Sequence, residues 1–300
     1  MGDTRVAVTG LDHIALAVPD LETALGFYTD AWGLVPVAEQ GGRHHLAGQQ
    51  SRHTDLVLSQ GPTAALDHIA LAVASPEVLE RLAKRLVNAG HRTMKVSAME
   101  LRPGQTAAVV THDPDGHRIE LAVGAQDEGA RDTSVQMAPL RLGHVVLGTP
   151  DQTAMTAFYH LLGFRVSDRN ATGMWFLRCN ADHHSLALIP ADQPWLQHMA
   201  YDVGTVNEVM RGLALLREHD VTPVWGPGRH GPGSNVFTYY RDPAGFFIEY
   251  YGDLDKFDDF DPNDDITVVE WGPEHRGDVW GIAGRPPAAF VAGPNAGSLS

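Results

Sequence analysis

An internal repeat constrains this chain more than any other feature. The heptapeptide Leu-Asp-His-Ile-Ala-Leu-Ala occurs at 11–17 and again at 66–72. Related segments, in which a histidine again begins a short run of apolar residues, occur at 142–148 and 196–202. Three of the four runs are rich in aliphatic or β-branched residues, which is typical of a strand. The repeat therefore predicts four similar units, each beginning with a β-strand.

A helical pattern follows each run. Residues 20–32 carry apolar residues at helical spacing behind Asp20, which predicts an N-cap. The next pattern, at 75–89, begins with Ser75 as the cap and Pro76 in the first turn. Residues 151–162 and 204–218 repeat the design, and short strand-like runs follow each helix. Each unit therefore reads β-α-β-β-β over about 50 residues.

The two halves of the chain also repeat each other. A D-P-x-G turn leads into a strand with a central glutamate at 113–121 and again at 242–250. Three pairs of residues lie 129 to 131 positions apart, namely His13 with His144, His68 with His198, and Glu120 with Glu249. We therefore predict an α+β fold of four βαβββ modules in two domains, at 1–123 and 139–256. The polar segment 124–138 is the expected linker, and we expect the tail, 257–300, to be a loop.

Composition limits the classes of function. The chain has 300 residues, which suits two domains, and a formal net charge of −15. Such an acidic balance argues against nucleic acid as a partner and against a polybasic membrane contact. Cys179 is the only cysteine, so no disulfide forms within the chain. The sequence begins without a signal-peptide pattern and has no apolar run near the ~20 residues of a membrane span, so we expect the cytoplasm.

The histidines and glutamates of the repeat form a recognisable ligand set. Two neutral imidazoles and one carboxylate on one face of an octahedron are the donors of Fe(II) oxygenases, and the opposite face stays open. His144, His198 and Glu249 supply this set from three separate strands. Side chains alternate along a strand, so His144 shares its face with Val146. His13, His68 and Glu120 offer the same set in the first half, so ligand type alone does not separate the halves.

These motifs resemble the vicinal-oxygen-chelate superfamily, and more narrowly its two-domain type I extradiol dioxygenases, such as dihydroxybiphenyl and catechol 2,3-dioxygenases. The resemblance covers about residues 8–255 and is most specific at 179–188 and 228–251. It implies modules whose strands curve into one half-open barrel per domain. It also implies Fe(II), with Mn(II) possible, in the C-terminal domain, and a homo-oligomeric enzyme of aromatic catabolism. Its substrates would be a catechol and O₂, and its product a hydroxymuconic semialdehyde.

The resemblance also implies roles for three further residues. His184 matches the family's acid–base histidine, and His230 matches a histidine that hydrogen-bonds the deprotonated catechol oxygen. Tyr239 matches a tyrosine that hydrogen-bonds the iron-bound catechol oxygen. The corresponding positions of the first half are Thr54, Leu101 and Val110. We therefore expect the chemistry in the C-terminal domain and no metal in the N-terminal domain.

Two apolar residues, Val146 and Phe176, stand where the family places the walls of its substrate pocket. Plain core packing explains them equally well. The polar residues that often follow the histidine at 230 are replaced here by glycine and proline, which leaves the contacts to substrate open.

Other functions remain open from the sequence. A 4-hydroxyphenylpyruvate dioxygenase-like enzyme would share the His-His-Glu site but would not require the set of His184, His230 and Tyr239. A glyoxalase- or epimerase-like enzyme would typically add a fourth protein ligand. A non-catalytic small-molecule binding protein would work without a metal set.

Overall fold

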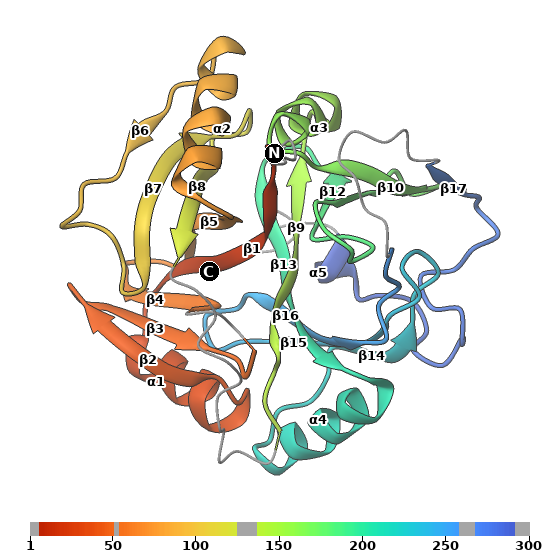
Figure 1. Cartoon of the computed structure of the whole chain (residues 1–300). Helices are drawn as coiled ribbons and strands as arrows, with labels where there is room; N and C mark the ends of the chain where they lie inside the picture. The colour runs from red at the N-terminus through yellow and green to blue at the C-terminus, as the bar shows by residue number, and fades with distance from the viewer. Residues whose placement is uncertain (1–5, 51–53, 125–136, 258–267, 292–300) are drawn as a thin grey trace.

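The computed structural model describes residues 6–50, 54–124, 137–257 and 268–291 (Figure 1). The first module consists of β1 (Val8–Val18), α1 (Leu21–Gly26), the π-helical turn η1 (Phe27–Ala31), β2 (Val35–Gln40), β3 (Arg43–Ala47) and β4 (Leu56–Gln60). The second consists of β5 (Ala65–Val73), α2 (Pro76–Asn88), β6 (Met94–Lys95), β7 (Gln105–His112) and β8 (Arg118–Gly124). Both modules follow the predicted βαβββ order.

The second half repeats this order. Its third module consists of β9 (Arg141–Thr149), α3 (Gln152–Leu161), β10 (Arg165–Asn170), β11 (Trp175–Arg178) and β12 (Leu186–Pro190). The fourth consists of β13 (Trp195–Gly204), α4 (Val206–Glu218), β14 (Trp225–Arg229), β15 (Val236–Arg241) and β16 (Phe247–Gly252). The tail adds β17 (Val269–Trp271) and α5 (Ala288–Val291). The prediction of four modules in an α+β fold is confirmed.

Each half forms one mixed sheet from two modules. The first sheet has the strand order β2-β3-β4-β1-β5-β8-β7-β6, and the second has β14-β15-β16-β13-β9-β12-β11-β10-β17. In both, the first strands of the two modules pair antiparallel, as β1 with β5 and β9 with β13. In Figure 1, α2 and α3 lie side by side at one end of the molecule, and α1 and α4 lie at the other.

The helix caps follow the sequence, with one difference. The side chain of Ser75 accepts a hydrogen bond from the backbone of Val78, and Asp151 caps α3 in the same way. The segment 20–32, predicted as one helix, instead changes from α1 to the π-helical η1, in which Trp32 N donates to Phe27 O. Apolar spacing does not separate the wider π turn from an α turn, because both bury the same side of the segment.

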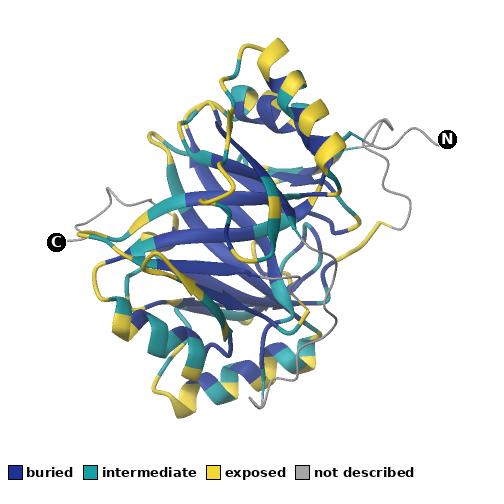
Figure 2. Cartoon of the chain, turned by 60° about the vertical axis from the view of Figure 1, so that its left-hand side comes forward, coloured by how far each residue is buried: buried dark blue, intermediate teal, exposed yellow. Residues whose placement is uncertain are grey.

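The two faces of each sheet pack against different parts of the molecule. On β9, Val145 and Leu147 point into a core that both halves share, whereas Val146 faces the other side with a separate small cluster. Figure 2 shows the buried strands running between helices whose outer sides are exposed. Alternation along the strands therefore separates the shared core from the concave face on which the histidines lie.

Aromatic contacts join the halves. The ring of Trp32, which follows η1, stacks on Tyr250 of β16 with centroids 3.7 Å apart. The hydroxyl of Tyr250 also donates to Trp32 O. These contacts fix the second sheet against the first, so the two halves form one continuous core.

The tail differs from the expectation of a loop. Its strand β17 extends the second sheet by pairing parallel with β10, and α5 buries Phe290. Of the predicted linker, residues 125–136 lie outside the described part of the chain, as do residues 258–267 and 292–300 of the tail. The boundaries of the linker therefore stay a prediction.

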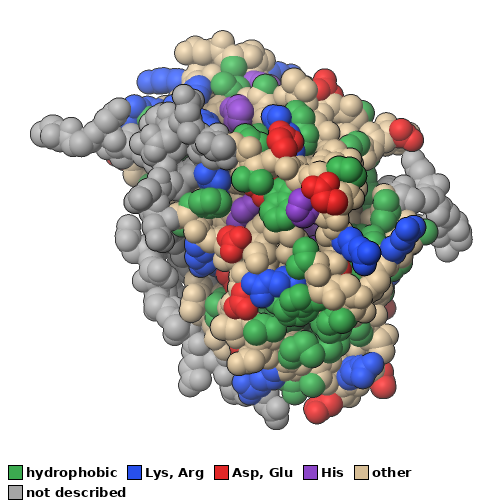
Figure 3. Space-filling view, turned by 90° about the vertical axis from the view of Figure 1, so that its right-hand side faces the viewer, with side chains coloured by type: hydrophobic (Ala, Val, Ile, Leu, Met, Phe, Trp, Pro, Cys, Tyr) green, Lys and Arg blue, Asp and Glu red, His purple; other side chains and the backbone are tan. Residues whose placement is uncertain are grey.

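Two observations concern possible partners. Among the described helices, none combines the length and the apolar character needed to cross a membrane. On the face in Figure 3, acidic and basic side chains are interspersed among the described residues, without an extended basic area. This face offers no surface matched to a polyanion.

Candidate metal centre

Three buried side chains converge in the C-terminal half. His144 comes from β9, His198 from β13 and Glu249 from β16. The Nε2 atoms of the two histidines lie 3.1 and 3.2 Å from Oε2 of Glu249 and 3.4 Å from each other. Bonds of ~2.1 Å to an octahedral ion place neighbouring ligand atoms about 3 Å apart. The donor set therefore fits one divalent metal ion, as the sequence predicts.

Strand register brings these ligands together. His144 is opposite Ala200, two residues after His198 on the same face of β13, and Ala200 is also opposite Glu249 on β16. A Cβ atom on Gly143 would lie 1.7 Å from the hydroxyl oxygen of Tyr251. Glycine at this position therefore leaves room for the side chain of Tyr251, which reaches from β16 across β13 to β9.

The protonation of the three groups suits metal binding. Burial lowers the pKa of His198 to about 4, which keeps its imidazole neutral. Burial alone would raise the pKa of Glu249, but the adjacent imidazoles of His144 and His198 lower it to about 2. Near pH 7 the centre therefore presents lone pairs and one negative charge to a cation.

Amide side chains orient two of the ligands. Nδ1 of His198 donates to the side-chain oxygen of Gln197, so its Nε2 carries the lone pair that a metal needs. Asn235 donates from Nδ2 to Oε1 of Glu249 at 3.2 Å. Nδ1 of His144 is buried without a hydrogen-bond partner in the structure. Nothing in the sequence indicates Gln197 or Asn235, because amides beside ligands carry no motif of their own.

His184 lies beside the centre but not on a strand. It belongs to the connection between β11 and β12, where neighbouring side chains need not point to opposite faces. His183 is buried, and its Nε2 lies 3.1 Å from Oδ2 of Asp168. The ring of His184 lies 4.3 Å from that of His144, between centroids. Burial, followed by the neighbouring His144, lowers the pKa of His184 well below its usual range, which keeps a neutral base there.

His230 and Tyr239 form a hydrogen-bonded pair on the other side of the centre. Nε2 of His230 lies 3.0 Å from the hydroxyl of Tyr239, and its Nδ1 donates to Gly277 O in the tail at 2.7 Å. Tyr239 is opposite Glu249 in the sheet, and its ring lies 5.1 Å from that of His198. Burial lowers the pKa of His230 and raises the pKa of Tyr239 well above its ordinary value. Tyr240, the next residue on β15, instead packs in the shared core.

Val146 and Phe176 lie in one apolar cluster on the face of the centre. They pack with Ala187, and Phe176 lies 5.1 Å from the ring of His184 in an edge-to-face arrangement. The structure thus brings all eight predicted site residues to one side of the second sheet. The roles of the individual residues stay predictions.

Phe290 of α5 closes the centre from the tail. Its ring stacks on His198 with centroids 5.8 Å apart and meets Tyr239 edge to face at 4.7 Å. Gln197, which orients His198, also donates to Phe290 O at 2.9 Å. Periodicity could not reveal this residue, because it stands in a Gly- and Pro-rich tail about 40 residues after the last repeat.

The N-terminal half repeats the ligand geometry. His13, His68 and Glu120 are buried, and their candidate ligand atoms also lie within 4.8 Å of one another. Val110, the counterpart of Tyr239, is opposite Glu120 just as Tyr239 is opposite Glu249. The expected asymmetry at this position is therefore present in the fold.

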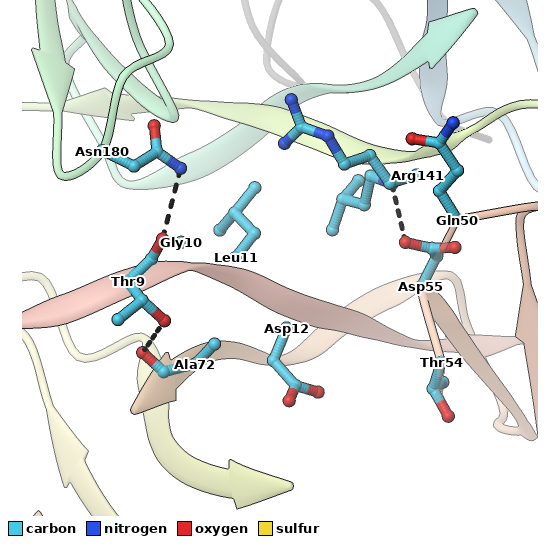
Figure 4. A pocket seen from close by; sticks show the side chains of 11 residues that line it. Thr9, Gly10, Leu11, Asp12, Gln50, Thr54, Asp55, Ala72, Arg141 and Asn180 are labelled. Carbon is cyan, nitrogen blue, oxygen red and sulfur yellow. Dashed lines mark hydrogen bonds between the residues drawn. The ribbon is translucent and has the colours of Figure 1, made fainter. Parts of the chain in front are cut away.

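A cavity of about 160 Å³ lies where the halves meet (Figure 4). Asp12 and Arg141 are among the residues that line it, and Asn180 donates to Thr9 O at 3.3 Å beside it. None of the eight predicted site residues lines this cavity. The cavity belongs to the interface between the two halves and not to the metal centre.

Comparison with known proteins agrees with this geometry. The model of the Glyoxalase/Bleomycin resistance protein/Dioxygenase superfamily matches residues 10–121 and 141–250. Metapyrocatechase 2 of Cupriavidus necator is 31% identical, over 90% of this chain and 91% of the relative. The manganese-dependent 2,3-dihydroxybiphenyl 1,2-dioxygenase of Geobacillus genomosp. 3 is also 31% identical, over 89% and 92%. The Mn(II)-bound glyoxalase from Novosphingobium aromaticivorans is 33% identical, with a TM-score of 0.85 over 94% of this chain and 93% of that one.

Proposed function

Since this chain belongs to the Glyoxalase/Bleomycin resistance protein/Dioxygenase superfamily, we propose that it is an extradiol dioxygenase, which uses O₂ to cleave a catechol ring next to its diol. One observation carries the proposal. His184 lies against one metal ligand, His144, while the pair of Tyr239 and His230 lies beside the other, His198. Acid–base groups therefore flank the centre on two sides, where a diol needs them.

A divalent metal binds at His144, His198 and Glu249, and we propose Fe(II) as the physiological ion. Fe(II) supplies the redox chemistry by which a catechol, which has no unpaired electrons, reacts with O₂. Mn(II) fits the same donors, and two similar proteins are named for it. Metal analysis of protein purified without air identifies the resident ion. Zn(II) alone, with no iron or manganese, would overturn the assignment.

The residues that flank the centre have separate roles in the proposed reaction. The neutral imidazole of His184 takes a proton as the diol binds and returns it as the ring opens. Tyr239 donates its hydroxyl hydrogen to one diol oxygen, and its high pKa keeps that hydrogen in place at neutral pH. Before the diol binds, this hydrogen points to Nε2 of His230. When it turns to the diol, Nε2 of His230 becomes free to hydrogen-bond the second oxygen. Val146, Phe176 and Phe290 exclude water from an aromatic substrate.

The reaction has a defined balance. One catechol and one O₂ give one hydroxymuconic semialdehyde, and both oxygen atoms enter the product. No external reductant is needed. An assay with Fe(II)-loaded protein and a panel of catechols should show one O₂ consumed per catechol and a yellow ring-opened product. The proposal fails if metal-loaded, folded protein consumes no O₂ with any catechol that binds.

Site variants test the residues separately from the reaction. We expect His144→Ala to lose both the metal of this centre and turnover. We expect His184→Gln to keep the metal and to lower kcat by about 10²–10⁴-fold, the usual contribution of a general acid–base. His219→Gln, in an exposed position at the end of α4, is the matched control. Full turnover in His144→Ala would remove the metal assignment.

A glyoxalase-type isomerase is the second candidate, because the solved glyoxalase is 33% identical over nearly the whole chain. Isomerisation consumes no O₂ and does not require the pair of His230 and Tyr239. Incubation with the hemithioacetal of methylglyoxal and glutathione, under argon, decides between the two. Turnover there together with no O₂ uptake on catechols would favour the isomerase.

We also propose a cytoplasmic homo-oligomer that takes part in aromatic catabolism. The single cysteine, Cys179, is buried and agrees with a reducing compartment. Light scattering on the metal-loaded protein measures the number of subunits. A strictly monomeric protein at micromolar concentration would contradict the oligomer.

A further inference from the structure

We propose that the N-terminal half holds a second divalent-metal site, formed by His13, His68 and Glu120. The three residues come from β1, β5 and β8, which correspond to β9, β13 and β16 of the C-terminal centre. All three are buried, and the Nε2 atoms of the two histidines lie 2.9 Å apart. Neighbouring donors of one octahedral ion stand at about this separation.

The hydrogen bonds around the two histidines are of the kind found around histidine ligands of a metal. Nδ1 of His13 lies 2.7 Å from Oδ1 of Asp12, and Nδ1 of His68 lies 3.3 Å from Oδ2 of Asp67. A carboxylate that accepts the Nδ1 hydrogen fixes the tautomer whose Nε2 bears a lone pair. Two lone pairs then face each other at 2.9 Å beside a carboxylate. A metal ion between them stabilises that arrangement.

The third ligand is oriented as well. Nε2 of Gln105 donates to Oε1 of Glu120, as Asn235 donates to Glu249 in the other half. Every ligand of the N-terminal set thus has a partner that holds it. In the C-terminal centre, Nδ1 of His144 has none.

A third histidine lies on the same face. His45 on β3 is opposite Val57, which is opposite Ala15, and Ala15 follows His13 by two positions on β1. Its side chain is buried, and its Nδ1 has no hydrogen-bond partner in the structure. His45 takes the position that Phe176 has in the C-terminal half. The repeat in the sequence does not reveal this correspondence, because a histidine and a phenylalanine share no motif.

Nearby arginine side chains lower the affinity for a cation that we expect at this site. Arg118 lies 3.8 Å from Glu120 and 3.7 Å from Asp67, and its Nη1 lies 3.2 Å from Nδ1 of His68. Arg102 pairs with Asp12, and Arg43 pairs with Asp67. These three guanidinium groups oppose a cation, so we expect the second site to bind more weakly than the first. A metal-free arrangement is the alternative. In it, Nδ1 of His68 accepts a hydrogen bond from Arg118, and Nε2 of His68 donates to His13. Hydrogen bonds alone then hold the cluster together.

Metal stoichiometry separates these two arrangements. Equilibrium dialysis of apoprotein against Mn(II), without air, should give two bound ions per chain, the second at higher free Mn(II). We expect one ion in His13→Gln/His68→Gln and one in His144→Gln/His198→Gln. A single ion in the wild type, lost in His144→Gln/His198→Gln, would overturn the second site. Two ions in a folded His13→Gln/His68→Gln would do so too.

Two more variants keep the test decisive. If His13→Gln/His68→Gln does not fold, Glu120→Gln removes one ligand with almost no change of shape, and it should weaken only the second binding step. Arg118→Phe copies Phe247, its counterpart in the C-terminal half, and should strengthen the second step about tenfold or more. Unchanged binding in both variants would exclude the site. From the sequence we expected no metal here, and the stoichiometry decides between that expectation and the second site.

Discussion

The hydroxyl of Tyr28 in the N-terminal half donates to Oδ2 of Asp242 in the C-terminal half at 2.8 Å. A second, matching hydrogen bond joins the halves the other way. Tyr159 of the C-terminal half donates to Oδ2 of Asp113 in the N-terminal half at 3.3 Å. Each tyrosine follows or lies on the helix of one module, and each aspartate opens the D-P-x-G turn of a module in the other half. The duplicated sequence therefore produces a pair of reciprocal contacts across the interface.

Tyr28→Phe should lower the stability of the whole chain without changing its chemistry. The variant leaves the buried Asp242 without a donor from the other half, which typically costs about 1–3 kcal/mol. Urea unfolding of the metal-loaded protein measures the change. Tyr159→Phe is the matched variant, and we expect a smaller effect because its contact is longer. Equal stability of Tyr28→Phe and wild type would show that the interface does not depend on this bond.

Asp242 should also make stability depend on pH. Burial raises its pKa to about 6 from 3.8, although hydrogen bonds from Tyr28 and from backbone N–H groups act in the other direction. The folded chain then binds more protons than the unfolded chain between about pH 4 and 6. The free energy of unfolding should therefore fall as pH rises through this window, by ~3 kcal/mol. In Asp242→Asn this part of the decline should disappear, whereas the exposed control Asp192→Asn should keep it.

Tyr239→Phe tests the hydrogen-bonded side of the metal centre. Loss of the hydroxyl removes the donor to a diol oxygen and the partner of His230, so we expect kcat to fall by ~10²-fold or more. The metal content should not change, because the three ligands are untouched. Tyr240→Phe is the control, since that side chain belongs to the shared core on the other face of β15. Equal kcat in Tyr239→Phe and wild type would remove Tyr239 from the mechanism.

Phe290→Ala tests whether the tail contributes to substrate binding. The ring of Phe290 covers His198 and Tyr239, and its loss opens the centre to water. We expect the KM for catechols to rise about tenfold, the equivalent of ~1.4 kcal/mol of binding free energy, with the metal retained. The neighbouring Val291 has a 61% exposed side chain, so Val291→Ala should leave KM unchanged. A change confined to stability would assign Phe290 to packing alone.

Phe176→Ala tests the apolar wall. Its ring packs with Val146 and Ala187 beside His184, so its removal should widen the pocket. We expect the ratio of kcat/KM for a substituted catechol over unsubstituted catechol to rise by about 10-fold or more, since one or two methylene groups are worth ~1–3 kcal/mol in an apolar pocket. An unchanged ratio across several substituents would indicate that Phe176 belongs only to the core.

The sequence by itself determined the modules, their order and the candidate metal ligands. These follow from alternation within strands, caps at helix starts and a repeat of about 130 residues, all of which depend only on the order of residues along the chain. His144 and Val146 share a face because they are two positions apart on one strand. No distant contact is needed to establish that.

Only the tertiary structure decided what surrounds those ligands. Gly277 and Phe290 reach the centre from the tail, and His45 reaches the N-terminal cluster through the register of three strands. His184 lies in a connection, where alternation does not hold. Contacts of this kind depend on how separate segments pack, and no spacing along the chain encodes them. The repeat thus fixes where two metal sites can form, while the packing around each determines what it can do.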